Sequence, residues 1–194
     1  DLTFDNIYHE HYNYWSLTAL VNFFNQFECT ISKAEKINTH GGSIRIYIKK
    51  GRKNKADKSV KNLLREEDRF GIKNYDTYKK FAKKIKKIKS NFKKNINKLK
   101  LKNESIIGYG SPAKATTSLN FFGISDEIDF IVEDNKLKHG KFLPGVKIPI
   151  KSVKEVKKKP SYAIVLAWNF FNEIQSKNKD LADKFINIKD LEKD

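Results

Sequence analysis

Residues 105–114 read Ser105-Ile106-Ile107-Gly108-Tyr109-Gly110-Ser111-Pro112-Ala113-Lys114, an apolar stretch that leads through glycines into a helical pattern. Gly108, Gly110 and Ala113 form a G-x-G-x-x-A pattern with a strand before it and a helix after it. Such glycines let the backbone approach a ligand closely, and the helix N-terminus attracts an anion. The segment therefore predicts a strand-to-helix turn of an α/β fold. It leaves open whether this turn contacts a ligand or is only a tight turn.

The residues after this turn continue the α/β pattern. A helical pattern ends at Gly123, and further short apolar strands are expected at 128–132, 162–168 and 185–188. Strands that alternate with helices imply a parallel sheet with right-handed crossovers. Glu133 and Asp134 end the second strand, where a ribose-binding acid often lies. We therefore expect an α/β chain with a Rossmann-like parallel sheet in its C-terminal half.

The residues before this turn predict helices and a short two-strand segment. Ser16 can cap a helix that runs to Phe27, and strands are expected at 30–37 and 43–48. Helices follow at 59–70, ended by Gly71, and at 75–102. We expect an active-site segment over 1–58, a helical connector over 59–103 and a Rossmann-like C-terminal domain over 104–194. The long helix should bury one apolar stripe, made of Tyr78, Phe81, Ile85, Ile88, Phe92, Ile96 and Leu99.

The net charge of +17 invites a nucleic-acid interpretation. Many of the lysines lie between Lys79 and Lys102, on the faces of the long helix that the apolar stripe leaves free. Arginine, the preferred reader of phosphates and base edges, occurs only at Arg45, Arg52, Arg65 and Arg69. A solvated helix surface explains this lysine run better than a nucleic-acid site does.

Other compositional features limit the setting. The chain has no apolar run long enough for a membrane span, and we expect no signal peptide. Its single cysteine, Cys29, excludes a disulfide framework and a cysteine-based zinc site within these residues. We expect a cytoplasmic protein. The absence of methionine and the start at Asp1 fit a fragment of a longer polypeptide.

The run Tyr8-His9-Glu10-His11-Tyr12-Asn13-Tyr14 gathers side chains that move protons. Imidazole titrates near neutral pH, and a neighbouring carboxylate or phenol can orient it, so general acid–base chemistry is one interpretation. Metal binding by His9 and His11 on one face of a strand is a weaker one, because no further ligands are evident. From residue types alone, an aromatic packing segment with surface histidines explains the run best.

Two glycine-containing loops are further candidates. The turn His40-Gly41-Gly42-Ser43 could bind an oxyanion through backbone N–H groups, although a plain glycine turn is the simpler interpretation. The loop Lys138-His139-Gly140-Lys141 is basic and could contact phosphate. Trp168 and Asn169 follow the third strand, at the edge where α/β sheets place ligands.

Taken in order, these motifs resemble the nucleotide-sugar C-methyltransferases. The resemblance covers nearly the whole chain. It rests on Phe4–Tyr12, Thr39–Arg45, Gly108–Lys114, Asp134-Asn135, Gly140–Gly145, Ile148–Ile150 and Trp168-Asn169. Two departures are Ala167, where a proline is common, and His139, where a glutamine is frequent; they bear on the sugar contacts.

The resemblance implies an architecture larger than this chain. Members carry an N-terminal cysteine-ligated zinc module, a central S-adenosylmethionine-binding domain and a C-terminal Rossmann-like domain. This chain is similar to the last portion, and it lacks both the zinc cysteines and the glycine-rich donor motif. The resemblance thus implies a nucleotide-sugar substrate and S-adenosylmethionine held mainly by a domain absent here. It also implies the zinc and donor domains as partners in the same polypeptide, and no activity for the fragment alone.

The resemblance also assigns roles to residues. Members methylate a carbon of a keto-deoxysugar attached to a nucleoside diphosphate. The catalytic base would be His11, with Tyr8 and Glu10 close to the reacting carbon, and no metal ligands are expected. Substrate contacts would come from His40, Gly41, Gly42, Ser43, Tyr109, Gly110, Ser111, Pro112, Lys114 and Lys141. The alternatives are a non-catalytic nucleotide-binding module and, less favoured, a basic nucleic-acid-binding domain.

Overall fold

The computed structural model describes residues 2–51, 53–102 and 104–193, with His40 described by its backbone alone. The chain divides into two compact units. The hairpin unit comprises Asp1–Thr3 and His9–Lys83, and the sheet unit comprises Phe4–Tyr8 and Lys84–Asp194. The predicted division at residues 58 and 103 stays a prediction. None of the helices over the described ranges is long and apolar enough to cross a membrane.

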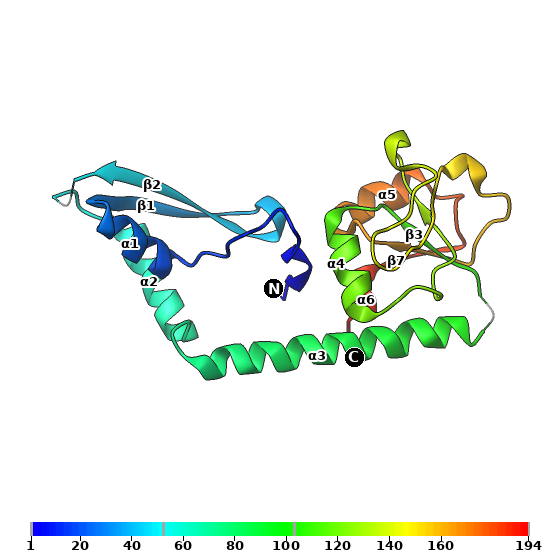
Figure 1. Ribbon diagram of the computed structural model, residues 1–194, viewed down its shortest axis with the longest axis horizontal. Helices are drawn as coiled ribbons and strands as arrows, with labels where there is room; N and C mark the ends of the chain where they lie inside the picture. Colours follow the sequence, from blue (N-terminus) through cyan, green and yellow to red (C-terminus); the bar gives the residue numbers. More distant parts are fainter. Residues whose placement is uncertain (1, 52, 103, 194) are drawn as a thin grey trace. The chain divides into compact units, whose positions relative to one another are not determined.

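The hairpin unit is a two-stranded ribbon backed by helices (Figure 1). Its elements are α1 (Leu17–Gln26), β1 (Cys29–Ile37), the 3-10 turn η2 (Thr39–Gly41), β2 (Ser43–Lys50) and α2 (Lys58–Phe70). The strands pair antiparallel, as a short connection between strands favours. The predicted helices and strands of this region are confirmed.

Local signals set the helix ends of the hairpin unit. The Ser16 side chain accepts a hydrogen bond from the Ala19 N–H, the expected N-cap of α1. Gly71 ends α2 in the left-handed conformation, which costs glycine little. Glu67 of α2 adds a second cap to α1, because its carboxylate accepts the N–H groups of Leu17 at 2.6 Å and Thr18 at 2.8 Å. This carboxylate fixes α2 against α1.

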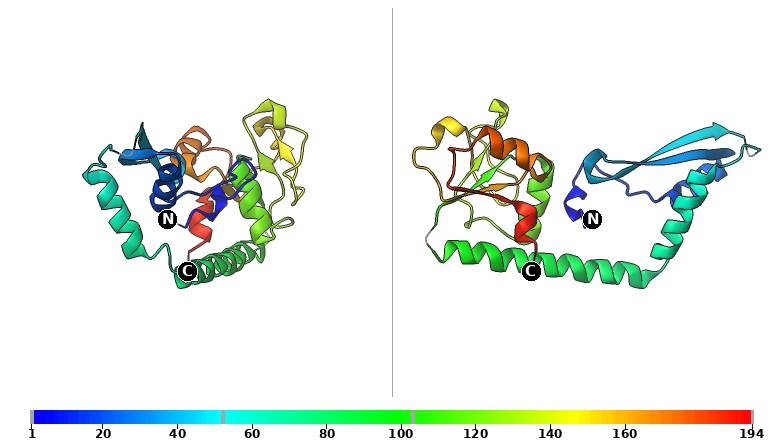
Figure 2. Two further views of the ribbon diagram at one scale, coloured as in Figure 1. Left: turned by 60° about the vertical axis from the view of Figure 1, so that its left-hand side comes forward. Right: turned by 180° about the vertical axis from the view of Figure 1, so that it is seen from behind.

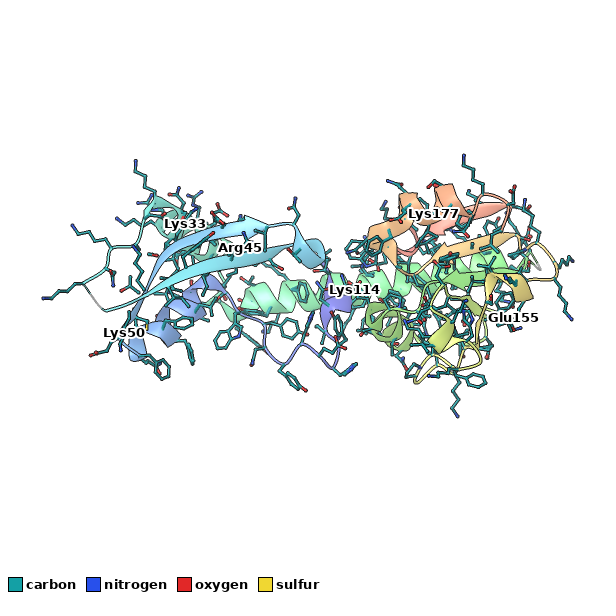
Figure 3. The ribbon with its side chains drawn as sticks, turned by 90° about the horizontal axis from the view of Figure 1, so that it is seen from above. Lys33, Arg45, Lys50, Lys114, Glu155 and Lys177 are labelled. Carbon is teal, nitrogen blue, oxygen red and sulfur yellow. The ribbon has the colours of Figure 1, made fainter. Side chains whose placement is uncertain are left out.

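One face of the ribbon is buried under the two helices. Buried members of this core are Leu17, Ile31, Ala34, Val60 and Leu63. Ile44 and Ile46 of β2 pack against this core. Ile48 is 43% exposed, so the predicted burial of every second residue of β2 stops at Ile46. The opposite face is polar, and Figure 3 labels Lys33 and Arg45 on it. There Glu35 pairs with Lys33 and accepts the Tyr47 hydroxyl at 3.0 Å.

The sheet unit contains a five-stranded parallel sheet in the order β5-β4-β3-β6-β7. Its elements are β3 (Ile106–Tyr109), α4 (Ala113–Phe122), β4 (Ile131–Val132), β5 (Ile150–Lys151), β6 (Tyr162–Val165), α5 (Phe171–Lys177), β7 (Lys184–Asn187) and α6 (Ile188–Leu191). Because β3 comes first and lies in the middle, the chain winds outward in one direction and then in the other. This is the doubly wound order of a Rossmann-like fold. The predicted fold class is confirmed.

Some strand limits differ from the prediction. Ile128–Phe130 lie before β4, which has only Ile131 and Val132. Trp168 lies in the 3-10 turn η5 (Trp168–Phe170) and not in β6. β5 was not predicted, because a two-residue strand between loops leaves no pattern in the sequence. The loop before β5 folds back on itself, with an isolated antiparallel bridge between Phe142 and Pro149, and β5 then pairs parallel with β4.

Helices cover both faces of this sheet (Figures 1 and 2). Helix α5 lies on one side, and α6 lies on the other side with the C-terminal half of α3 (Tyr75–Lys100). The α5 side has a core that includes Ile107, Tyr109, Val165 and Phe185. On the other side Phe92 of α3 stacks on Phe122 of α4, with ring centroids 4.0 Å apart and neither side chain exposed.

The predicted apolar stripe of α3 is buried only in part. Ile85, Ile88, Phe92 and Ile96 are buried in the sheet unit, whereas Tyr78 is 54% and Phe81 41% exposed. Polar contacts reinforce the buried half: Asn95 donates to the Leu191 carbonyl at 3.1 Å and so satisfies the end of α6. The C-terminal half of α3 is therefore part of the core of the sheet unit.

Candidate functional site

A cavity of about 340 Å³ lies at the carboxyl ends of β3 and β6. The strand order reverses between these two strands, and open α/β sheets bind ligands at this position. The cavity is lined by Tyr109, Gly110, Ser111, Pro112, Glu133, Asp134, Lys138, Ala167, Phe170, Glu173 and Ile174. The structure therefore brings together four of the predicted substrate residues, Tyr109, Gly110, Ser111 and Pro112.

The glycine turn in this cavity is closed by a carboxylate. Glu133 accepts the Ser111 N–H at 2.9 Å and the Ser111 hydroxyl at 2.6 Å. Lys138 donates to the Ser111 carbonyl at 2.9 Å and lies 3.4 Å from Glu133. Burial alone would raise the pKa of Glu133, but the bonds from Ser111 and Asn135 and the Lys138 charge outweigh it and lower the pKa to about 2. An ionised side chain thus occupies the N–H group that a bound phosphate would use.

Asp134, the second acid at the end of β4, is also engaged. It accepts the Tyr109 hydroxyl at 2.9 Å. Burial raises the pKa of Tyr109 to about 12, and the bond to Asp134 adds to this shift. The phenol therefore stays protonated at neutral pH and acts as a hydrogen-bond donor.

The sequence predicts a ribose site at Glu133 and Asp134, whereas in the structure Glu133 holds the glycine turn and Asp134 accepts the Tyr109 hydroxyl. Lys138, predicted as part of a basic loop that could contact phosphate, lines the cavity, as do Phe170 and Glu173, to which the sequence assigned no role. The position of an acid directly after the second strand was the available signal for Glu133. Phe170 and Glu173 lie after the predicted strand over 162–168, and no motif in the sequence points to them.

Two predicted substrate residues lie elsewhere in the sheet unit. Lys141 is exposed in the loop before Phe142 and is not among the residues that line the cavity. Lys114, at the start of α4, has its ammonium 4.7 Å from the centre of the Trp168 ring. The ammonium is buried without a hydrogen-bond partner among the described residues, and burial lowers the pKa of this lysine. Figure 3 shows Lys114 beside the 3-10 helix η1 (Phe4–Asn6).

The hairpin unit has a cavity of its own, of about 760 Å³. It is lined by Thr3, Trp15, Lys36, Ile37, Asn38, Gly41, Gly42, Ser43, Ile44 and Glu67. Gly41 and Gly42 have φ values of 85° and 123°, so this turn depends on glycine. The Ser43 hydroxyl donates to the Thr39 carbonyl at 3.0 Å. The predicted residues Gly41, Gly42 and Ser43 thus meet in one cavity, while the side chain of His40 lies outside the described residues.

The run from Tyr8 to Tyr14 is irregular and not a strand. His11 is half-buried, and its ring meets the Tyr14 ring edge-on at 6.3 Å between centroids. His9 is exposed and lies 3.9 Å from Glu10. Tyr8 belongs to the sheet unit, and His11 belongs to the hairpin unit. Within the described ranges, no group of three or more metal-ligating side chains was found.

Among the described residues, the glycine turn of the sheet unit does not fit a site for S-adenosylmethionine. The one G-x-G turn with a strand before it has its Ser111 N–H bonded to Glu133, within a turn that α4 and β4 already pack. The neighbouring cavity also carries Asp134 and Glu173. Its lining therefore has no net positive charge to attract the carboxylate of S-adenosylmethionine.

Residues 38–187 match the family described as the C-methyltransferase C-terminal domain, and the chain belongs to this family. Among characterised relatives, it is similar to the C-methyltransferase NovU of Streptomyces niveus. The two are 31% identical over 183 residues, which cover 93% of this chain and 44% of that protein. The chain therefore spans less than half the length of this relative.

Proposed function

We propose that this chain is the C-terminal part of an S-adenosylmethionine-dependent C-methyltransferase that acts on an NDP-linked keto-deoxysugar. In this proposal it supplies the general base and part of the sugar-nucleotide cleft. The observation that carries the proposal is the family match over residues 38–187. It is supported by a cavity at the reversal point of the sheet, where this fold type binds ligands.

The proposed chemistry begins at a carbon next to the sugar ketone, whose hydrogens the carbonyl makes acidic. His11 removes one of these hydrogens as a proton, and the electron pair moves into an enolate. Tyr8 donates a hydrogen bond to the enolate oxygen, and Glu10 orients the imidazole. S-adenosylmethionine, held outside this chain, supplies the methyl group, so the steps assigned to these residues end at the enolate. A half-buried His11 beside an aromatic ring suits such a base, because partial burial keeps water away.

Each cavity, taken by itself, suits one kind of ligand group. In the sheet unit, the Ser111 N–H is occupied, and the lining carries three carboxylates against the single ammonium of Lys138. Carboxylates repel phosphates but accept hydrogen bonds from hydroxyl groups, so this cavity suits the sugar or ribose hydroxyls. The cavity of the hairpin unit has one carboxylate, Glu67, whose oxygens accept the N–H groups of α1, and its Lys36 and glycine turn suit phosphates. These assignments extend the predicted binding roles of Tyr109–Pro112 and Gly41–Ser43.

Substitution of His11 tests the proposal most directly. In the full-length polypeptide, His11→Asn should lower kcat for methyl transfer by about 100- to 10,000-fold, the usual contribution of a general base. The same variant should lose wash-in of solvent deuterium at the sugar carbon, measured by mass spectrometry without methyl donor. His9→Asn is the matched control, because His9 is 83% exposed and two residues away. Unchanged turnover in His11→Asn would favour the non-catalytic nucleotide-binding module.

A further inference from the structure

The segment Phe4–Tyr8 belongs to the sheet unit although residues 9–83 separate it from the rest of that unit in the chain. Phe4 is buried against two rings of α4, with centroid distances of 4.9 Å to Phe121 and 5.6 Å to Phe122. The Thr117 hydroxyl of α4 donates to the Ile7 carbonyl at 3.3 Å. Apolar and backbone contacts thus hold this segment along α4.

A buried carboxylate adds a directional contact. Asp5 is fully buried, and it accepts the indole N–H of Trp168 at 2.6 Å. The Lys189 ammonium of α6 lies 3.4 Å from the other carboxylate oxygen and 3.0 Å from Glu192. We call Asp5, Trp168 and Lys189 the latch. It joins the N-terminal segment to the carboxyl end of β6 and to α6.

The surroundings of Trp168 show why the charge at Asp5 matters. Two ammonium groups flank this ring, Lys114 at 4.7 Å and Lys189 at 5.3 Å from its centre. Lys114 is buried without a hydrogen-bond partner among the described residues, so the Asp5 charge is needed to offset it, whereas Lys189 is also paired with Glu192. Burying a carboxylate costs free energy, whereas the burial of Phe4 alone would hold the segment without this cost. The benefit of such a group is a fixed register, because its hydrogen bonds form in one position only.

We propose that Asp5 is a positioning residue, held by Trp168 and Lys189 so that the backbone leading into Tyr8 takes one register on the sheet unit. Tyr8 follows Asp5 by three residues, and the Tyr8 N–H bonds to the Asn6 carbonyl at 3.0 Å. A shift of the latch would therefore move the Tyr8 phenol. Its catalytic consequence rests on the proposed function, whereas the latch itself can be measured without any activity.

The first experiment measures the latch in this chain by NMR. Trp15→Phe leaves Trp168 as the single indole, since the chain has two tryptophans. Asp5→Ala in this background should shift the indole N–H resonance and speed its exchange with solvent at least about tenfold. Asp5→Asn keeps an oxygen acceptor and should preserve most of the protection. Asp183→Ala, which removes a surface pair with Lys159 at 3.2 Å, is the matched control. A folded Asp5→Ala chain with unchanged indole exchange would overturn the latch. If this variant does not fold, the Trp15→Phe chain alone decides, because an indole N–H of Trp168 that exchanges as fast as that of free tryptophan would overturn the latch.

The second experiment measures the consequence in the full-length polypeptide. Asp5→Ala should lower kcat about tenfold, with KM for the nucleotide-sugar changed less than twofold. The pH–rate profile should keep its wild-type pKa values, because His11 is intact. Wild-type kcat with a disrupted latch would overturn the positioning role and leave the proposed function standing. Full activity of His11→Asn would instead remove the proposed function and, with it, the catalytic part of this inference.

Discussion

Glu133 shows at the residue scale how one side chain changes the meaning of a motif. A G-x-G turn before a helix usually offers its N–H groups to a phosphate. Here the Ser111 N–H and hydroxyl both donate to Glu133, and Lys138 neutralises the carboxylate. The turn is therefore held by the protein itself, and the cavity beside it is left with hydrogen-bond acceptors.

The charge of Glu133 should contribute to stability with a definite pH dependence. Glu133→Gln keeps the shape and should lower the free energy of unfolding at pH 7 by about 2 kcal/mol, because charge-assisted bonds become neutral ones. The folded pKa of about 2 lies below the ordinary value of 4.5, so the contribution is full above pH 4.5. It is lost as the pH falls towards 2.

Urea unfolding of Glu133→Gln and wild type between pH 3 and pH 7 checks this prediction. The difference between the two proteins should shrink as the solution becomes more acidic. Glu127→Gln is a suitable control, since Glu127 accepts a hydrogen bond only from the Ser125 N–H at 3.2 Å in the described contacts. A difference in the free energy of unfolding that stays constant between pH 3 and pH 7 would show that the pKa of Glu133 is not lowered in the folded protein.

At the element scale, the turn between β3 and α4 depends on glycine for two separate reasons. Gly110 has a φ of +84°, and a Cβ there would lie 3.0 Å from the Cβ of Ala167. Gly140 has a similar φ of +73°, but a Cβ there would meet open space. The pair therefore separates backbone strain from steric contact.

Alanine substitutions at these two glycines should give unequal losses of stability. Gly140→Ala should cost about 1 kcal/mol from the left-handed backbone alone. Gly110→Ala should cost about 2–3 kcal/mol, because crowding against Ala167 is added. Thermal unfolding of both variants measures the difference, and equal losses would show that β3 and β6 can move apart at this turn.

Helix α3 should differ in local stability along its length. Ile88, Phe92 and Ile96 are buried, whereas Tyr78 and Phe81 are about half-exposed. We expect backbone amides over 88–96 to exchange at least about tenfold more slowly than those over 80–84, because local opening is easier where few apolar contacts are lost. Hydrogen–deuterium exchange with peptide mass spectrometry tests this expectation. Uniform protection along α3 would contradict it.

The elements that sequence predicted well are those with local causes. Ser16 caps α1 through its own side chain, and Gly71 and Gly123 end helices in the left-handed conformation. These features require no knowledge of distant residues. In contrast, β5 exists because β4 supplies its hydrogen bonds, and Phe81 is exposed because the sheet unit covers only the later turns of α3.

The candidate site was predicted less completely, for the same reason. The turn from Tyr109 to Pro112 was found from its pattern, but the role of Glu133 depends on two strands lying side by side. The contact between Lys114 and Trp168 joins residues that no sequence pattern connects. Asp5 is an acidic residue within the 3-10 helix η1, and only the fold shows that it is buried against Trp168.

At the scale of the whole molecule, the residues proposed for catalysis belong to two units, and the glycine turn of the sheet unit does not fit the methyl donor. The 194-residue chain alone should therefore transfer no methyl group from labelled S-adenosylmethionine to a keto-deoxysugar nucleotide. The full-length polypeptide is the positive control in the same assay. Turnover by the 194-residue chain would show that its own residues can bind the donor.

The stacked rings of Phe92 and Phe122 bear on how this protein can be shortened for crystallography or recombinant expression. A gene trimmed to begin at residue 104 would delete Phe92 and Ile96 and uncover one side of Phe122, which is fully buried in the complete chain. Such a product should precipitate readily, since newly wetted aromatic surface promotes self-association. A cut placed before Ile85 would keep the ring pair together, although it would still discard Asp5.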